Sequence, residues 1–184
     1  SDITVSLGTA STATEGTDYG TVSDITISAG ATTGTTTFTP TDDSMYETST
    51  NETAIISIDS VSGGSAAENG TQAVTITITE NESAPTVTLA VSATSIAENA
   101  GSSLTLTATL SGTTSQDVTV ALSSSSSATE GTDYGTVSDI TISSGSTTGT
   151  ASFTPTDDSL YETSTDETAT VSITGVSGGS ATES

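Results

Sequence analysis

Sixteen consecutive residues, ATEGTDYGTVSDITIS, occur twice in this chain, at residues 13–28 and again at 128–143. They belong to a longer duplication, in which residues 1–69 align without a gap on residues 116–184 and 50 of the 69 positions are identical. Self-similarity at a fixed long spacing is typical of tandem arrays, and the offset of 115 residues is the size of a domain. We therefore expect two copies of one domain-sized unit, each with a core of its own.

Apolar residues in both copies alternate with polar residues, most of which are Thr or Ser. Alternation with period two is the pattern of half-buried β-strands, and Thr suits an outer strand face because its side chain is β-branched. No useful stretch carries an apolar stripe at the helical spacing. The pattern therefore predicts an all-β protein, although the formal charge of −23 alone would favour disorder. The clearest alternating segments are 3–7, 74–78, 87–91, 104–108 and 118–122.

One complete repeat can be assembled from strands predicted in order along the chain. About seven short strands with turns between them, in a repeat of 115 residues, predict tandem immunoglobulin-like β-sandwich domains. We expect the first repeat over 1–83, without its first two strands, and the second over 84–184, without its last strand. Predicted strands are 87–91, 104–110, 117–122, 136–142, 149–154 and 168–174, followed by a strand equivalent to 72–79.

This phase of the repeats leaves two interpretations of the chain open. Residues 1–184 are either a window on a longer repetitive polypeptide or a true subunit whose neighbours supply the missing strands. An arbitrary cut through the repeats is a third. The expected partners follow from these two interpretations. They are neighbouring repeats of the same chain, or neighbouring subunits placed end to end.

The composition excludes several classes of function. The chain has no Lys, Arg, His or Cys, and it has 23 acidic residues. A Ser-His-Asp triad, a Lys base and a zinc site made of Cys and His are therefore impossible. Nucleic acid is not an expected partner, because phosphate binding needs Lys or Arg. Membrane insertion is not expected either, because no apolar run approaches the ~20 residues of a bilayer span.

Many of the acidic residues stand at equivalent places in the two copies. Each copy has Gly-Thr-Asp-Tyr-Gly, then Thr-Asp-Asp followed by Tyr-Glu, and then a Glu that opens the next predicted strand. With the acids after the strand at 74–78, these motifs resemble the Calx-beta domain. That family includes the regulatory calcium-binding domains of sodium–calcium exchangers and repeats of large bacterial surface adhesins. The resemblance covers nearly the whole repeat and implies a β-sandwich that binds Ca²⁺.

The resemblance also implies which carboxylates bind the ion. In calcium-binding members of the family, the ligands come from the acid after the first strand, the Asp-Tyr turn, the Asp-Asp loop with its two Glu residues, and the terminal acidic cluster. Transferred to this chain, the implied ligands of the first repeat are Asp18, Asp42, Asp43, Glu47, Glu52, Glu80 and Glu82. Those of the second repeat are Glu98, Asp133, Asp157, Asp158, Glu162 and Glu167.

Charge supports a metal, and turn chemistry offers an alternative. Clustered carboxylates without Lys or Arg repel one another, and Ca²⁺ relieves this better than Mg²⁺ because it accepts 6–8 oxygens in a flexible geometry. Alternatively, Asp18 and Asp133 close Asx-turns and the Asp-Asp pairs cap turns in water. The remaining acids are expected on solvated faces, among them Glu15, Asp24, Asp59, Glu68, Glu130, Asp139 and Glu183.

These expectations together predict a function. We expect a structural spacer repeat of an extracellular surface adhesin or filament, stiffened by Ca²⁺ and without enzymatic activity. One alternative is a subunit of a strand-complemented filament. Another is a sandwich module that binds sugars or proteins through its end loops, although the chain has no Trp to stack on a sugar.

Overall fold

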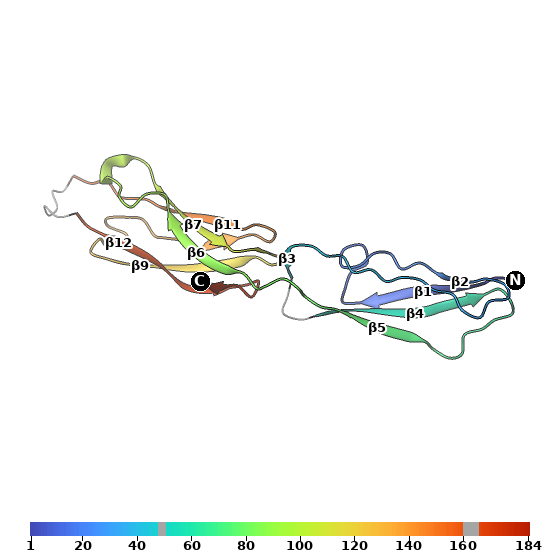
Figure 1. Ribbon diagram of the computed structural model, residues 1–184. Coiled ribbons are helices and arrows are strands. Elements are labelled where there is room, and N and C mark those ends of the chain that lie inside the picture. Colours follow the sequence, from blue (N-terminus) through green and yellow to red (C-terminus); the bar gives the residue numbers. More distant parts are fainter. Residues whose placement is uncertain (48–50, 160–165) are drawn as a thin grey trace. The chain divides into compact units, whose positions relative to one another are not determined.

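The computed structural model describes residues 1–47, 51–159 and 166–184, with the backbone alone at Ser126 (Figure 1). The chain divides into two compact units. Unit 1 consists of residues 1–43 and 50–80, and unit 2 of residues 44–49 and 81–184. The prediction of an all-β fold is confirmed in both.

Unit 1 contains one four-stranded antiparallel sheet in the order β2-β1-β4-β5, and its three longest strands lie side by side in Figure 1. Its strands are β1 (Ile3–Ser11), β2 (Ile25–Ile27), β4 (Glu52–Ser62) and β5 (Ala73–Ile78). The strands pair antiparallel, with Ile3 opposite Ile27, and a bulge interrupts the β1–β4 ladder between Ser6 and Leu7. Alternation along β1 and β2 turns Ile3, Val5, Ile25 and Ile27 to the same face of the sheet.

Unit 2 contains two larger sheets that pack as a sandwich. The first has the order β10-β9-β12, with β9 (Val118–Ser126), β10 (Ile140–Ile142) and β12 (Ala169–Ser177). The second has the order β11-β7-β6-β13, with β6 (Thr86–Val91), β7 (Leu104–Leu110), β11 (Thr148–Phe153) and the short parallel strand β13 (Thr182–Glu183). A small parallel pair, β3 (Met45–Tyr46) with β8 (Thr113–Thr114), and the 3-10 helix η1 (Glu98–Ala100) complete the unit.

One predicted strand is shorter than expected. The segment 136–142 pairs with β9 only at residues 140–142, where the ladder ends with Ile140 opposite Val120. Beyond that point the N–H of Leu122 donates to the carboxylate of Asp139, at 2.9 Å. The side chain takes the place that a backbone carbonyl would hold in a longer ladder, so pairing stops there.

The two units have different cores. In unit 2 the buried cluster joins the two sheets and includes Val87, Leu106, Val118, Val120 and Ile140. In unit 1 the buried cluster consists of Ala13, Tyr19, Ala54 and Ile56, with Phe38 and the inner residues of β5 packed against it. The core of unit 1 therefore lies around Tyr19 and the middle of β4, at some distance along the sheet from β2.

Candidate metal centre

Asp18 is held in place by a turn that follows β1. The backbone N–H of Thr14 donates to the Asp18 carboxylate, and the N–H of Asp18 donates back to the Thr14 carbonyl at 2.9 Å. The next residue, Tyr19, is 1% exposed and stacks on Phe38 with the ring centroids 4.8 Å apart. Asp133 makes the same contact with Thr129, next to the Tyr134–Phe153 stack. Both aspartates therefore close turns, but through the N–H four residues before them and not through the Asx-turn N–H two residues after them, and the buried tyrosine fixes the position of each.

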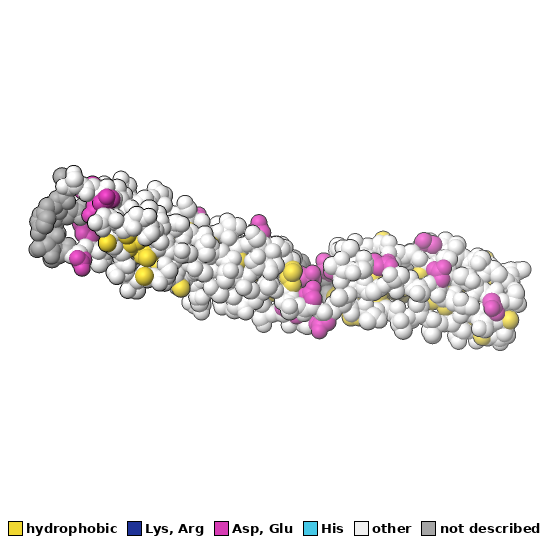
Figure 2. Space-filling view, turned by 90° about the horizontal axis from the view of Figure 1, so that it is seen from above, with side chains coloured by type: hydrophobic (Ala, Val, Ile, Leu, Met, Phe, Trp, Pro, Cys, Tyr) yellow, Lys and Arg dark blue, Asp and Glu magenta, His cyan; other side chains and the backbone are white. Residues whose placement is uncertain are grey.

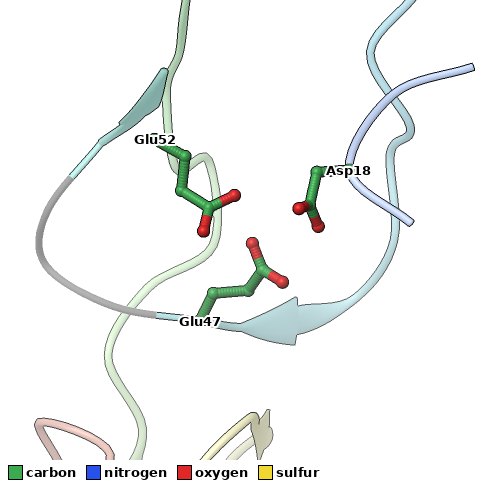
Figure 3. Close-up of side chains that lie close together, drawn as sticks. All are labelled: Asp18, Glu47 and Glu52. Carbon is green, nitrogen blue, oxygen red and sulfur yellow. The ribbon is translucent and has the colours of Figure 1, made fainter. Parts of the chain in front are cut away.

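Glu52 begins β4, opposite Ile78 of β5, and points toward Asp18 (Figure 3). Asp18, Glu47 and Glu52 each offer a carboxylate oxygen, and these atoms all lie within 4.8 Å of one another. All three side chains are half-buried. Oε2 of Glu52 is enclosed and has no hydrogen-bond partner among the described residues. Three of the carboxylates named from the sequence therefore come close together, and one of their oxygens faces no donor among the described residues.

The electrostatic cost of this arrangement falls on Glu52. Desolvation by burial raises the pKa of Glu52 above its usual 4.5, and the charge of Asp18, a hydrogen bond to Asp18 and the charge of Glu80 raise it further. Asp18, Glu52 and Glu80 all belong to unit 1. Each of these causes disfavours the charged form of the glutamate.

The chemistry of these ligands fits a hard divalent cation. Oxygen ligands from carboxylates are what Ca²⁺ prefers, and a half-buried oxygen without a donor is where a cation would gain most. In unit 1, Asp18 and Glu52 would hold the ion, with backbone carbonyls and water completing its 6–8 oxygens. A thiolate or imidazole metal is excluded because the chain has no Cys and no His.

The other ligands implied for the first repeat lie outside this group of three. Asp42 and Asp43 are exposed, and Glu82 is half-buried. Glu80 acts on Glu52 through its charge, but its carboxylate is not among the three that converge. Their roles as ligands stay predictions.

In unit 2 the implied ligands are more widely spaced. Glu98, on η1, accepts a hydrogen bond from the backbone N–H of Asp158 at 3.0 Å. Glu98, Asp133 and Glu167 line one hollow, together with Asp166, which was not among the ligands expected from the sequence. Asp157 is exposed, and Glu162 lies outside the described residues. Among the residues that the structure describes, the ligands implied for the second repeat include no group of three carboxylates as close as Asp18, Glu47 and Glu52.

Several acids that were expected simply on solvated faces have a structural role instead. Asp24 accepts hydrogen bonds from the Leu7 N–H at 2.9 Å and the Ser6 hydroxyl at 3.0 Å, at the bulge of β1. Asp139 does the same for Leu122, and Glu68 accepts from the Gln72 N–H. They are exposed, as expected, and Figure 2 shows acidic side chains spread over mostly uncharged polar surface. The usable signal was an Asp directly before each Ile-Thr-Ile strand.

Two all-β units in tandem, with carboxylates gathered beside an Asp-Tyr turn, define an acidic β-sandwich repeat protein. The chain belongs to the Calx-beta family: the model of the Calx-beta domain matches residues 1–82 and again residues 80–182. No match was found among the curated proteins. No helix in the described part of the chain is long and apolar enough to cross a membrane.

The matched domains correct the expected period. Successive domains occupy about 90 residues each, in place of the 115 expected from the sequence. The two lengths differ because they measure different things. The first match, residues 1–82, contains the four-stranded sheet of unit 1, whereas the offset of 115 residues is the distance from a position in one copy to the equivalent position in the next. Equivalent positions are still 115 apart, since Tyr19 bridges Pro40 as Tyr134 bridges Pro155. The boundary between repeats at residues 83 and 84 stays a prediction.

Proposed function

We propose that this chain is a pair of structural spacer repeats of an extracellular protein, and that unit 1 is stiffened by Ca²⁺. The observation that carries the calcium proposal is the enclosed Oε2 of Glu52, which has no hydrogen-bond partner among the described residues and belongs to a side chain that points toward Asp18. The chain contains no Lys, Arg or His that could supply a countercharge. A divalent cation would supply the countercharge that the side chains of this chain lack.

Calcium would stiffen unit 1 by joining two parts of its chain. Asp18 belongs to the turn after β1, and Glu52 is the first residue of β4. An ion between them replaces carboxylate repulsion with two coordinate bonds, so local opening of the sheet becomes less frequent. Calcium is scarce in cytoplasm and plentiful outside cells, and the proposal therefore places the stiff form outside.

The spacer role is supported by repetition. Two Calx-beta domains follow each other directly, and members of this family commonly occur in extracellular proteins. Ser and Thr make up 79 of the 184 residues, and the charge of −23 keeps such chains soluble and mutually repelling. Tandem modules of this kind add length without presenting a reactive group.

Calcium binding by the full chain tests the proposal. Titration calorimetry should show saturable binding. The unfolding temperature of unit 1 should rise with Ca²⁺ and fall with chelator. Asp18→Asn and Glu52→Gln should each weaken binding about tenfold or more, because each removes a charged ligand. Glu183→Gln is the matched control, since it removes the same charge from β13. Heat that does not saturate, or equal loss in the control variant, would count against a calcium centre.

A further inference from the structure

The same apolar strand face occurs in both units, but its burial differs. In unit 2, Val118, Val120, Ile140 and Ile142 are each 0% exposed. The equivalent residues of unit 1, Ile3, Val5, Ile25 and Ile27, are all only half-buried. The sequence difference between the two sets is a single methylene at Ile3. Something other than local sequence therefore buries this face in unit 2.

The β6–β7 hairpin, residues 85–110, is what covers the face in unit 2. Its inward side chains are Val87, Leu106, Ala108 and Leu110, which are at most 3% exposed and belong to the same buried cluster as Ile140 and Ile142. In the described part of unit 1 the only sheet is β2-β1-β4-β5, and no strands take the place of β6 and β7. The inner face of β1 and β2 is consequently an unpartnered sheet face.

A strand edge beside this face also lacks its partner. In unit 2, β11 pairs along its whole length with β7, from Thr148 opposite Thr109 to Phe153 opposite Leu104. The equivalent segment of unit 1, residues 33–38, joins no ladder among the described residues. Its backbone nevertheless runs as β11 does, because Gly34 approaches the Thr26 carbonyl as closely as Gly149 approaches that of Thr141. The edge is thus already shaped for a partner.

We propose that this face and edge of unit 1 form a docking site for a β-hairpin with the sequence of residues 85–110, supplied by another copy of the repeat. The second strand of the hairpin pairs with residues 33–38 in the register seen in unit 2, which places the counterpart of Leu104 opposite Phe38. Its inward side chains then cover Ile3, Val5, Ile25 and Ile27. Calcium is not required, so the inference stands or falls independently of the proposed metal centre.

The occupant follows from the molecule itself. Residues 1–69 and 116–184 are identical at 50 of 69 positions, so the surface that accepts the hairpin in unit 2 is nearly reproduced in unit 1. The hairpin carries one acid, Glu98, so it does not add much charge to an already acidic unit. Among the described residues there is one such hairpin, and unit 2 uses it. Exchange of this hairpin between two copies of residues 1–184 would uncover one face for each face covered, so an additional hairpin is needed for a net gain.

The test is the full chain with a second copy of residues 84–115 joined ahead of Ser1, as residues 84–115 stand ahead of Gln116. Amide exchange is followed by pepsin digestion and mass spectrometry. Peptides from 29–38 report on unit 1 and peptides from 144–153 on unit 2, because these segments differ in sequence whereas 13–28 and 128–143 do not. A matched control carries Asp at the positions of Leu106 and Leu110 in the added copy alone.

The expected result is slower exchange in 29–38, by about 100-fold, in the extended chain and not in the control. Protection in 144–153 should stay as it is in the chain without the extension. Equal protection by both extensions, or by neither, would overturn the proposal. Loss of protection in 144–153 would overturn it too, since the added copy would then have disturbed unit 2 instead of covering unit 1.

Discussion

Unit 1 and unit 2 share most of their sequence in the aligned region, yet they bury it differently. Tyr19 and Tyr134 are buried equally, at 1% and 2% exposed, and each stacks on its own Phe. Ile25 and Ile140 lie in identical sixteen-residue stretches, but only Ile140 is fully buried. The tyrosines are enclosed by residues that both units contain, such as the stacked Phe, whereas burial of Ile140 depends on the β6–β7 hairpin, which has no counterpart in the described part of unit 1. The shared sequence thus decides the burial of the turn, and the covering hairpin decides the burial of the strand face.

The sharpest way to break this comparison is to truncate the same residue in both units. Ile140→Ala should lower the free energy of unfolding of unit 2 by about 4 kcal/mol, because it leaves a cavity in a closed core. Ile25→Ala should cost unit 1 only about 1 kcal/mol, since that side chain is half-exposed. Urea unfolding followed by amide exchange measures each unit separately. Equal losses would mean that the face of unit 1 is covered in solution.

A second comparison uses Gly34 and Gly149, two equivalent glycines at which one backbone segment lies close against another. Gly149→Ala places a methyl group against the Thr141 carbonyl, in a strand that β7 holds on its other side. We expect a loss of about 2 kcal/mol in unit 2. Gly34→Ala meets the Thr26 carbonyl in the same way, but residues 33–38 can shift, so the loss should be about 1 kcal/mol or less. Thermal unfolding of the two variants gives the values, and a larger loss at Gly34 would contradict the free edge.

The carboxylates at the bulge should behave alike in both units. Asp24→Ala and Asp139→Ala each remove an acceptor from a backbone N–H at 2.9 Å. Because both contacts are exposed, each substitution should cost about 1 kcal/mol. Chemical denaturation of the single variants is sufficient. Asn at either position keeps an acceptor and serves as the control, and a difference above the error between the two units would show that the contact depends on the covering hairpin.

The smallest expected effect concerns pH. The pKa of Glu52 is raised in the folded state, so the folded protein binds its proton more tightly than the unfolded chain does. In chelator, this contribution to stability is present below the usual pKa of 4.5 and is lost as pH rises through the folded-state value. Glu52→Gln should remove that part of the pH dependence. Thermal unfolding of both proteins over pH 4 to 8 checks it, and identical profiles would contradict the raised pKa.

The strands were largely predictable because alternation is a local signal. The segments at 87–91, 104–110 and 149–154 correspond to β6, β7 and β11 within a residue or two. The parallel pair β3–β8 could not be predicted, since Met45 and Thr113 are distant in sequence and each strand has two residues. The convergence of Asp18 and Glu52 followed from a family resemblance. The enclosure of one Glu52 oxygen depends on how β4 and the turn pack, which spacing does not encode.

The near-identity of the two sheets has a consequence for the order of folding. During synthesis the β6–β7 hairpin emerges after the sheet of unit 1 and before β9. The first sheet face that the hairpin can cover is therefore that of β1 and β2 in unit 1, and not the face of unit 2. Once β9 is made, the short connection 111–117 favours packing of the hairpin against β9 over packing against β1. The chain between β1 and the hairpin is about ten times longer, a closure penalty of about 2 kcal/mol in the unfolded chain. Correct assembly of this protein therefore depends on a competition for the hairpin between the sheet of unit 1, which is made first, and β9, which is closer along the chain.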